Sequence, residues 1–147
     1  MRKLTLGLIA PLFIVCGCGG GGTTSHLKFV ITQTTFTGNL KDANDVQIGT
    51  ITTVVKPDNT YTMTSTYGPG FTINGPLQVG SAGDAALSFF FVPDAAGTFQ
   101  GDAVTPSTTY TGGGHVTLVN GHLQGGFQFG SNAQVYPESF FDGDVAG

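Results

Sequence analysis

Charged residues are scarce in this chain of 147 residues, and basic residues are the scarcest of them. Lysine and arginine together number 5, against 9 aspartate and glutamate residues, and Arg2 is the single arginine. Proteins that bind nucleic acids or anionic lipid headgroups do so with clusters of basic side chains. The composition therefore argues against a nucleic-acid partner and against a basic membrane-binding patch.

Tryptophan is absent, and cysteine occurs only at Cys16 and Cys18. A disulfide between two such near neighbours would be strained, and the common redox motif has two residues between its cysteines rather than one. The chain after Cys18 must therefore fold without disulfides or cysteine-bound metal. A domain of about 130 residues buries enough surface to do so, and we expect no cofactor.

The first residues carry the pattern of an export signal. Arg2 and Lys3 give a basic start, and the apolar run over 4–15 is too short for a membrane span, which needs roughly 20 residues. The stretch Val15-Cys16-Gly17-Cys18 then resembles the lipobox of bacterial lipoproteins, in which an apolar residue, a small residue and glycine precede the cysteine. The resemblance implies cleavage before Cys18, which would carry diacylglycerol and an acyl chain such as palmitate.

This resemblance divides the chain into a signal peptide over 1–17, expected to be helical, a lipid-anchored Cys18 with a flexible tether over 18–26, and a domain over 27–147. The mature chain would keep three lysines and all nine acidic residues, a net charge of −6. Gly19 is not the aspartate that resembles an inner-membrane retention signal in enteric bacteria. We therefore expect a protein held at the outer membrane or cell surface by its lipid.

From residue 27 onward, apolar and polar residues alternate, and turn residues interrupt the chain every 8 to 12 residues or so. The alternation is clearest over 61–67 and 71–79. Short links between successive strands predict an antiparallel meander of about 8–9 strands, closed into a small up-and-down β-barrel, with a β-sandwich as the alternative. The expected strands cover 27–37, 46–56, 60–67, 70–79, 85–92, 97–104, 107–119, 122–129 and 138–145.

Asn120-Gly121 predicts a two-residue hairpin turn of type I′. This turn pairs Val119 with His122 and Leu118 with Leu123. One face of the hairpin is then apolar and the other polar. The apolar face comprises Val116, Leu118, Leu123, Phe127 and Phe129, and the polar face comprises His115, Thr117, His122, Gln124 and Gln128.

A short Phe-x-Gly-Asn/Asp pattern occurs three times, over 36–39, 99–102 and 141–144. The irregular spacing argues against a repeat protein. We interpret each glycine as a place where the strand bends beside a packed phenylalanine. Convergence of the three segments on one binding surface is the alternative.

Two groups of residues have side chains that can bind metal ions. The run over 42–45 is acidic, but a calcium loop of the EF-hand type needs glycine and glutamate where Gln47 and Thr53 stand. A polar turn explains it better. His115 and His122 share a face, but their rows lie about 13 Å apart along the strands, which is too far to bind one ion. We expect both histidines to be exposed, and no metal.

The sequence gives little support for catalytic residues either. Asp142 and Asp144 lie about 7 Å apart on one terminal strand without a partner acid, so solvated charges at a sheet edge are the expectation. Ser65 and Ser88 lie in strands without the glycines of a nucleophile elbow. The sequence predicts no enzyme.

The triplet Phe89-Phe90-Phe91 places phenylalanine on both faces of one strand. The ring on the outer face is then either covered by another segment at the rim of the barrel or part of an exposed apolar patch that binds a partner. We therefore expect a non-enzymatic, membrane-anchored envelope lipoprotein that binds or presents something, either a small apolar ligand or an envelope protein. The alternative is an assembly subunit that docks through a strand edge or the phenylalanine patch. A hollow barrel would favour the ligand, and a filled barrel would favour assembly.

We predict that Cys18 is the acylated first residue of the mature protein. Cys18→Ser removes the thiol that would carry diacylglycerol and should abolish lipidation. Cys16→Ser should leave lipidation intact, because Cys16 lies in the peptide that is removed. Mass spectrometry of the membrane-extracted protein measures both, and an unmodified chain that begins elsewhere would contradict the prediction.

Overall fold

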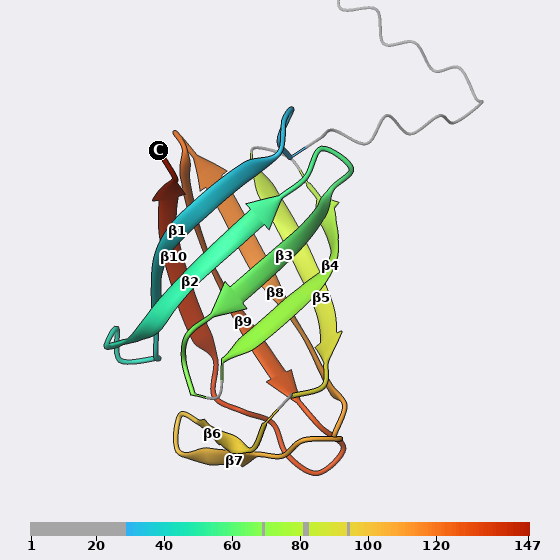
Figure 1. The fold of residues 1–147 in the computed structure, drawn as a ribbon. Helices are drawn as coiled ribbons and strands as arrows, with labels where there is room; N and C mark the ends of the chain where they lie inside the picture. The colour runs from blue at the N-terminus through green and yellow to red at the C-terminus, as the bar shows by residue number, and fades with distance from the viewer. Residues whose placement is uncertain (1–28, 69, 81–82, 94) are drawn as a thin grey trace, which may run out of the picture.

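The computed structural model describes residues 29–68, 70–80, 83–93 and 95–147, so the predicted signal peptide with its helix, Cys18 and the tether lie outside the described residues. The described part is all-β (Figure 1). Its strands are β1 (Thr34–Lys41), β2 (Gln47–Val55), β3 (Thr60–Ser65), β4 (Phe71–Val79), β5 (Asp84–Phe91), β6 (Gly97–Phe99), β7 (Asp102–Val104), β8 (Tyr110–Val119), β9 (His122–Gly130) and β10 (Ser139–Val145).

Eight of these strands form one closed antiparallel barrel in the order β1-β10-β9-β8-β5-β4-β3-β2. Strands that follow one another along the chain are neighbours, except that β5 pairs with β8 across the β6–β7 insertion and β1 pairs with β10. The predicted small up-and-down β-barrel is confirmed. The chain does not form the two-sheet sandwich that was the alternative.

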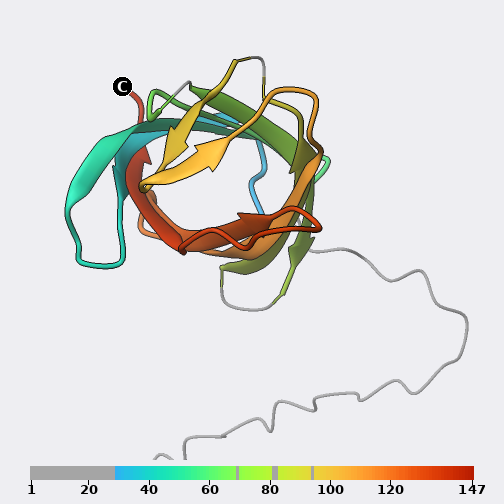
Figure 2. The same ribbon diagram turned by 90° about the horizontal axis from the view of Figure 1, so that it is seen from below.

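The segment predicted as one strand over 97–104 is a hairpin, in which β6 and β7 form a separate two-stranded sheet. The chain reverses at Gln100 and Gly101, whose φ values are 49° and 90°. Positive φ at two successive residues is typical of a tight turn between strands. Figure 2 shows this hairpin across the lower opening of the barrel.

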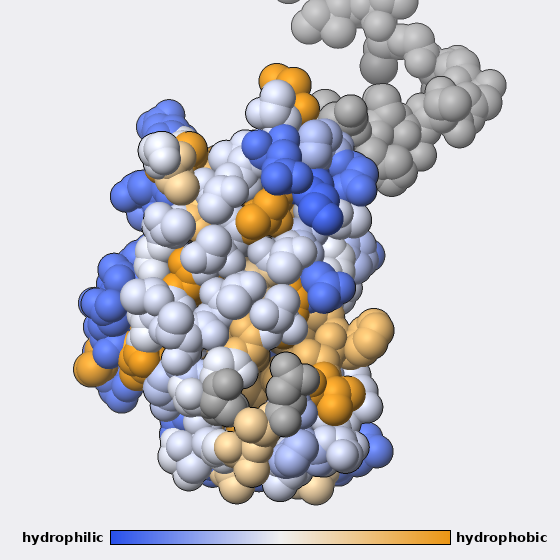
Figure 3. Space-filling model, in the orientation of Figure 1, coloured by the Kyte–Doolittle hydropathy of each residue, from blue (hydrophilic) through white to orange (hydrophobic). Residues whose placement is uncertain are grey.

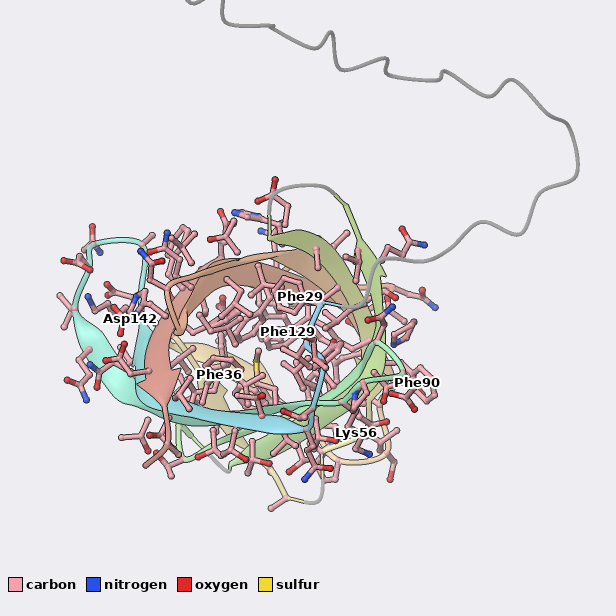
Figure 4. All side chains as sticks on the ribbon, turned by 90° about the horizontal axis from the view of Figure 1, so that it is seen from above. Phe29, Phe36, Lys56, Phe90, Phe129 and Asp142 are labelled. Atoms are coloured by element: carbon pink, nitrogen blue, oxygen red, sulfur yellow. The ribbon has the colours of Figure 1, made fainter. Side chains whose placement is uncertain are left out.

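The first strand begins at Thr34 rather than near residue 27, and it extends to Lys41. Thr34 pairs with Val55, which is the last residue of β2, so a longer β1 would have no partner there. The preceding Phe29 turns into the upper end of the barrel instead, where it is buried (Figure 4). Its main-chain N–H donates to Asn59 Oδ1 at 3.1 Å, which fixes this segment to the β2–β3 turn.

The barrel closes where two of the three Phe-x-Gly-Asn/Asp segments pair with each other. Gly38 of β1 lies opposite Gly143 of β10, and a Cβ atom at Gly38 would overlap the carbonyl oxygen of Asp142. The neighbouring Phe36 and Phe141 are buried. The third segment forms the β6–β7 turn. These glycines therefore allow the backbones to approach closely or to turn, as the strand-bend interpretation predicted, and the third segment lies in a different sheet from the other two.

Inward-facing side chains fill the barrel as the alternation predicts. In β4, for example, Ile73 and Leu77 are buried, whereas Thr72 and Asn74, on either side of Ile73, are exposed. The largest fully buried side chains are Tyr61, Phe36, Phe127, Leu40, Met63, Ile73, Leu123 and Val55.

The Asn120-Gly121 hairpin has the predicted register. Val119 pairs with His122 and Leu118 with Leu123, and φ is 52° at Asn120 and 78° at Gly121, as a type I′ turn requires. Leu123 faces the core, whereas His122 faces outward. The Nδ1 atom of His122 lies 2.8 Å from Asp144 Oδ1 on β10.

Replacing Gly38 by alanine should destabilise the protein by about 1–3 kcal/mol or more, because the added methyl group meets main-chain atoms of β10 that have no room to move. Gly80→Ala is the matched control, since a Cβ there would meet nothing closer than 3.6 Å. It should be neutral or stabilising by up to about 1 kcal/mol. Chemical denaturation of the two variants measures the difference, and equal stability would contradict the closure described here.

Leu123→Ala should lower the free energy of unfolding by about 2–5 kcal/mol, because it leaves a cavity in the core. His122→Ala should cost less than about 1 kcal/mol, since it removes only an exposed side-chain hydrogen bond to Asp144. The same denaturation series compares these two neighbours. Similar losses from both would mean that the faces of β9 are inverted.

Candidate functional site

The barrel interior has almost no empty space. Between the side chains of the described residues it leaves a cavity of about 10 Å³, bordered by Tyr61, Met63, Leu123 and their neighbours. A single water molecule needs roughly 10–15 Å³ of such space. The interior as it stands therefore has no room for an apolar ligand.

Both ends of the barrel are covered as well. Phe29 and Val30 occupy the upper end, and Phe99 of β6 packs into the lower end against Phe129, with ring centres 4.8 Å apart. The Tyr136 hydroxyl donates to the carbonyl oxygen of Ala103 and so holds β7 on the barrel. Burial first, and the neighbouring Tyr110 second, raise the pKa of Tyr136 to about 12. This hydroxyl is a structural donor at any physiological pH.

The barrel wall is incomplete between β4 and β5. Their ladder contains only Leu77–Leu87, Gln78–Ala86 and Val79–Ala85. By contrast, β4 pairs with β3 down to Phe71, and β5 pairs with β8 down to Phe91. Among the described residues, the lower halves of β4 and β5 thus have one strand partner each, and Figure 1 shows the two strands diverging toward the lower end.

Pro76 explains why the ladder stops. The Leu77 N–H donates to Asn59 on the β3 side, and main-chain groups alternate along a strand, so the nitrogen of Pro76 faces β5. Proline has no N–H to donate, and it is typically found where strand pairing is interrupted. The opposing carbonyl oxygen of Ser88 accepts a hydrogen bond from the Tyr61 hydroxyl instead, at 3.1 Å. Burial raises the pKa of Tyr61 well above its ordinary value.

Where the strands diverge, the surface is hollowed into a groove of about 480 Å³, which we call the β4–β5 groove. Phe71 and Phe91 form its floor, with ring centres 6.2 Å apart. Phe90 and Val92 stand on its β5 side and are 72% and 51% exposed. Figure 3 shows apolar surface at the lower right, and Figure 4 shows Phe90 on the outside of the barrel. The lining residues are Thr64, Ser65, Gly70, Phe71, Thr72, Asn74, Phe90, Phe91, Val92 and Pro93.

A second depression, on the outer face of β8, β9 and β10, is polar and has a volume of about 420 Å³. It contains His115, and Lys41 Nζ lies in it at 2.9 Å from Asp45 Oδ1 and 3.2 Å from Asp142 Oδ2. The two carboxylates, Asp45 first, raise the pKa of Lys41. Lys41 contacts both carboxylates, so each aspartate of this depression already has a cationic partner.

The acidic run over 42–45 forms a turn. Asp42 Oδ1 accepts the N–H groups of Asn44 and Val46, both at 2.9 Å. These bonds, that of Val46 first, lower the pKa of Asp42. The carboxylate that would start a calcium loop is therefore occupied by the main chain, as expected for a polar turn.

The other candidate residues are separated from one another. Asp142 pairs with Lys41, and Asp144 with His122; both aspartates lie on β10, which is bonded to β1 and β9 and is not the sheet edge that was expected. Ser65 is buried and accepts the Tyr67 N–H. No three His, Cys, Asp or Glu side chains gather into a metal site within the described ranges. None of the described residues form a helix that could cross a membrane.

Comparisons with known protein families, curated protein sequences and solved structures found no match for this chain. The sequence correctly predicted that Phe90 faces away from Phe89 and Phe91. It did not predict the opening beside Phe90, for which Pro76, within an otherwise alternating strand, was the available signal.

Proposed function

We propose that this protein is a non-enzymatic lipoprotein of the bacterial cell envelope that binds a partner protein through the β4–β5 groove. The export signal and Cys18 support the lipid anchor, at the outer membrane or cell surface. The observation that carries the binding function is the exposure of Phe90 and Val92 where the wall opens. Exposed apolar side chains gathered around a groove are typical of protein interaction sites.

The filled interior favours this function over binding of a small apolar ligand inside the barrel. Pockets for small molecules usually measure about 300–1,000 Å³ and enclose most of the ligand. The interior cavity of about 10 Å³ is far below this range. The β4–β5 groove has a suitable size, but it lies on the outer wall of the barrel, where a protein segment can reach it.

The position of the groove suits a tethered protein. The described chain begins at Phe29, in the upper end of the barrel (Figure 4), whereas the groove is lined by the lower halves of β4 and β5, which Figure 1 shows. Between Cys18 and Phe29 the chain could reach at most about 40 Å when fully extended. A lipid at Cys18 would therefore be joined to the barrel at the end opposite the groove.

The first test is whether Phe90 serves binding rather than folding. Phe90→Ser should change the free energy of unfolding by less than about 1 kcal/mol, because the ring is largely exposed. Phe89→Ala, on the buried face of the same strand, should cost about 3–5 kcal/mol. With the fold intact, a photocrosslinking amino acid at position 90 of the full lipidated chain should form an adduct with one envelope protein.

Two controls make this test specific to the groove. The same crosslinker at Phe140, which is 37% exposed on β10, should not form that adduct. Val92→Asp places a charge beside position 90 and should greatly reduce the adduct. Equal crosslinking from both positions, or an adduct indifferent to Val92→Asp, would contradict the proposed function.

A further inference from the structure

We propose that the β4–β5 groove receives an extended polypeptide segment, which pairs as an added strand with the free edge of β4 and places apolar side chains on Phe71, Phe90 and Phe91. This inference rests on the proposed function and names the kind of partner that the groove fits. It is carried by the direction of the main-chain groups on the two diverging strands.

On β4, the even-numbered residues direct their main-chain groups toward the opening. The Leu77 N–H donates toward β3, whereas the Gly80 N–H donates to the carbonyl oxygen of Asp84 across the β4–β5 side. Because the direction alternates, Thr72 and Asn74 present their N–H and C=O groups to the groove. The β4–β5 ladder ends at Leu77, so neither residue has a strand partner on that side within the part of the chain that the structure describes.

The facing strand has the same arrangement. The carbonyl oxygen of Asp84 faces β4, and the carbonyl oxygen of Gly83 accepts the Leu118 N–H on the β8 side. Even-numbered residues of β5 therefore face β4, and Phe90 directs its main-chain groups into the opening. The register that pairs Leu77 with Leu87 would set Asn74 opposite Phe90. A segment in the groove is thus flanked by main-chain donors and acceptors on both sides.

Unpaired strand edges attract another extended backbone, because only such a backbone supplies donors and acceptors at the matching spacing. Inward-facing side chains of the added strand would contact Phe71 and Phe91, and an outward one would lie beside Phe90. The lining residues carry no charge, while the mature chain is strongly acidic. The fitting occupant is therefore a segment of alternating apolar residues with basic flanks.

The probe is a fluorescent peptide of alternating valine and threonine with lysine at both ends. Its binding to the full lipidated chain in detergent micelles is measured by fluorescence anisotropy. A matched peptide is N-methylated at the residues whose N–H groups would face β4. Loss of two hydrogen bonds should weaken binding by about tenfold or more. Bound peptide should also slow hydrogen exchange at the Thr72 and Asn74 amides.

Two variants at position 72 distinguish the contribution of the main-chain N–H to binding from that of the side chain. Thr72→Pro removes an N–H that β3 does not use, and an edge position tolerates proline. It should weaken binding by about tenfold, because the peptide carbonyl group that this N–H would bond is then left without a donor. Thr72→Val keeps the N–H and should change binding less than about threefold.

The outcomes distinguish the inference from the proposed function. Equal binding of the methylated and unmethylated peptides, or no peptide binding while position 90 still forms its crosslink, would overturn the added strand and leave partner docking in place. Self-association of the chain alone that Thr72→Pro abolishes would identify a second copy as the occupant and also overturn the inference. Absence of both peptide binding and the crosslink would refute the two proposals together.

Discussion

The structure depends on close contact between main chains at the seam between β1 and β10. This seam joins strands from the two ends of the described chain, and it forms because Gly38 and Gly143 lie opposite each other without side chains between them. A closed barrel has no free sheet edges, which protects an all-β protein from pairing with other chains. The buried Phe36 and Phe141 beside these glycines couple the closure to the core.

Between β4 and β5, the closed barrel leaves main-chain groups of the described residues without a strand partner. Every other pair of neighbouring barrel strands has a longer ladder than β4 and β5, whose pairing stops beside Pro76. A residue that cannot donate a hydrogen bond thus determines where the wall opens. Tyr61 compensates from inside by bonding the Ser88 carbonyl, so the opening exists without an unsatisfied buried oxygen at that position.

The packing of the interior determines which surface is available for function. Aromatic rings fill the lower half, where Phe99 contacts Phe129 and Phe129 stacks on Tyr136. With the inside filled and both ends covered, the outer wall is the surface that the described residues leave open to a partner. On that wall, the β4–β5 groove has a floor formed by the partly buried rings of Phe71 and Phe91, and it is bordered by the exposed Phe90 and by the unpaired edges of β4 and β5.

The sequence by itself determined what depends on near neighbours: the strand alternation, the Asn120-Gly121 turn with its register, and the opposite faces of Phe89 and Phe90. Its reading of Cys18 as a lipidated residue stays a prediction. Only the tertiary structure decided the β1–β10 seam, the burial of Phe29, the β6–β7 hairpin over the lower end, and the opening beside Pro76. These features depend on which distant strands meet and how much volume their side chains occupy, and a local pattern does not encode either quantity.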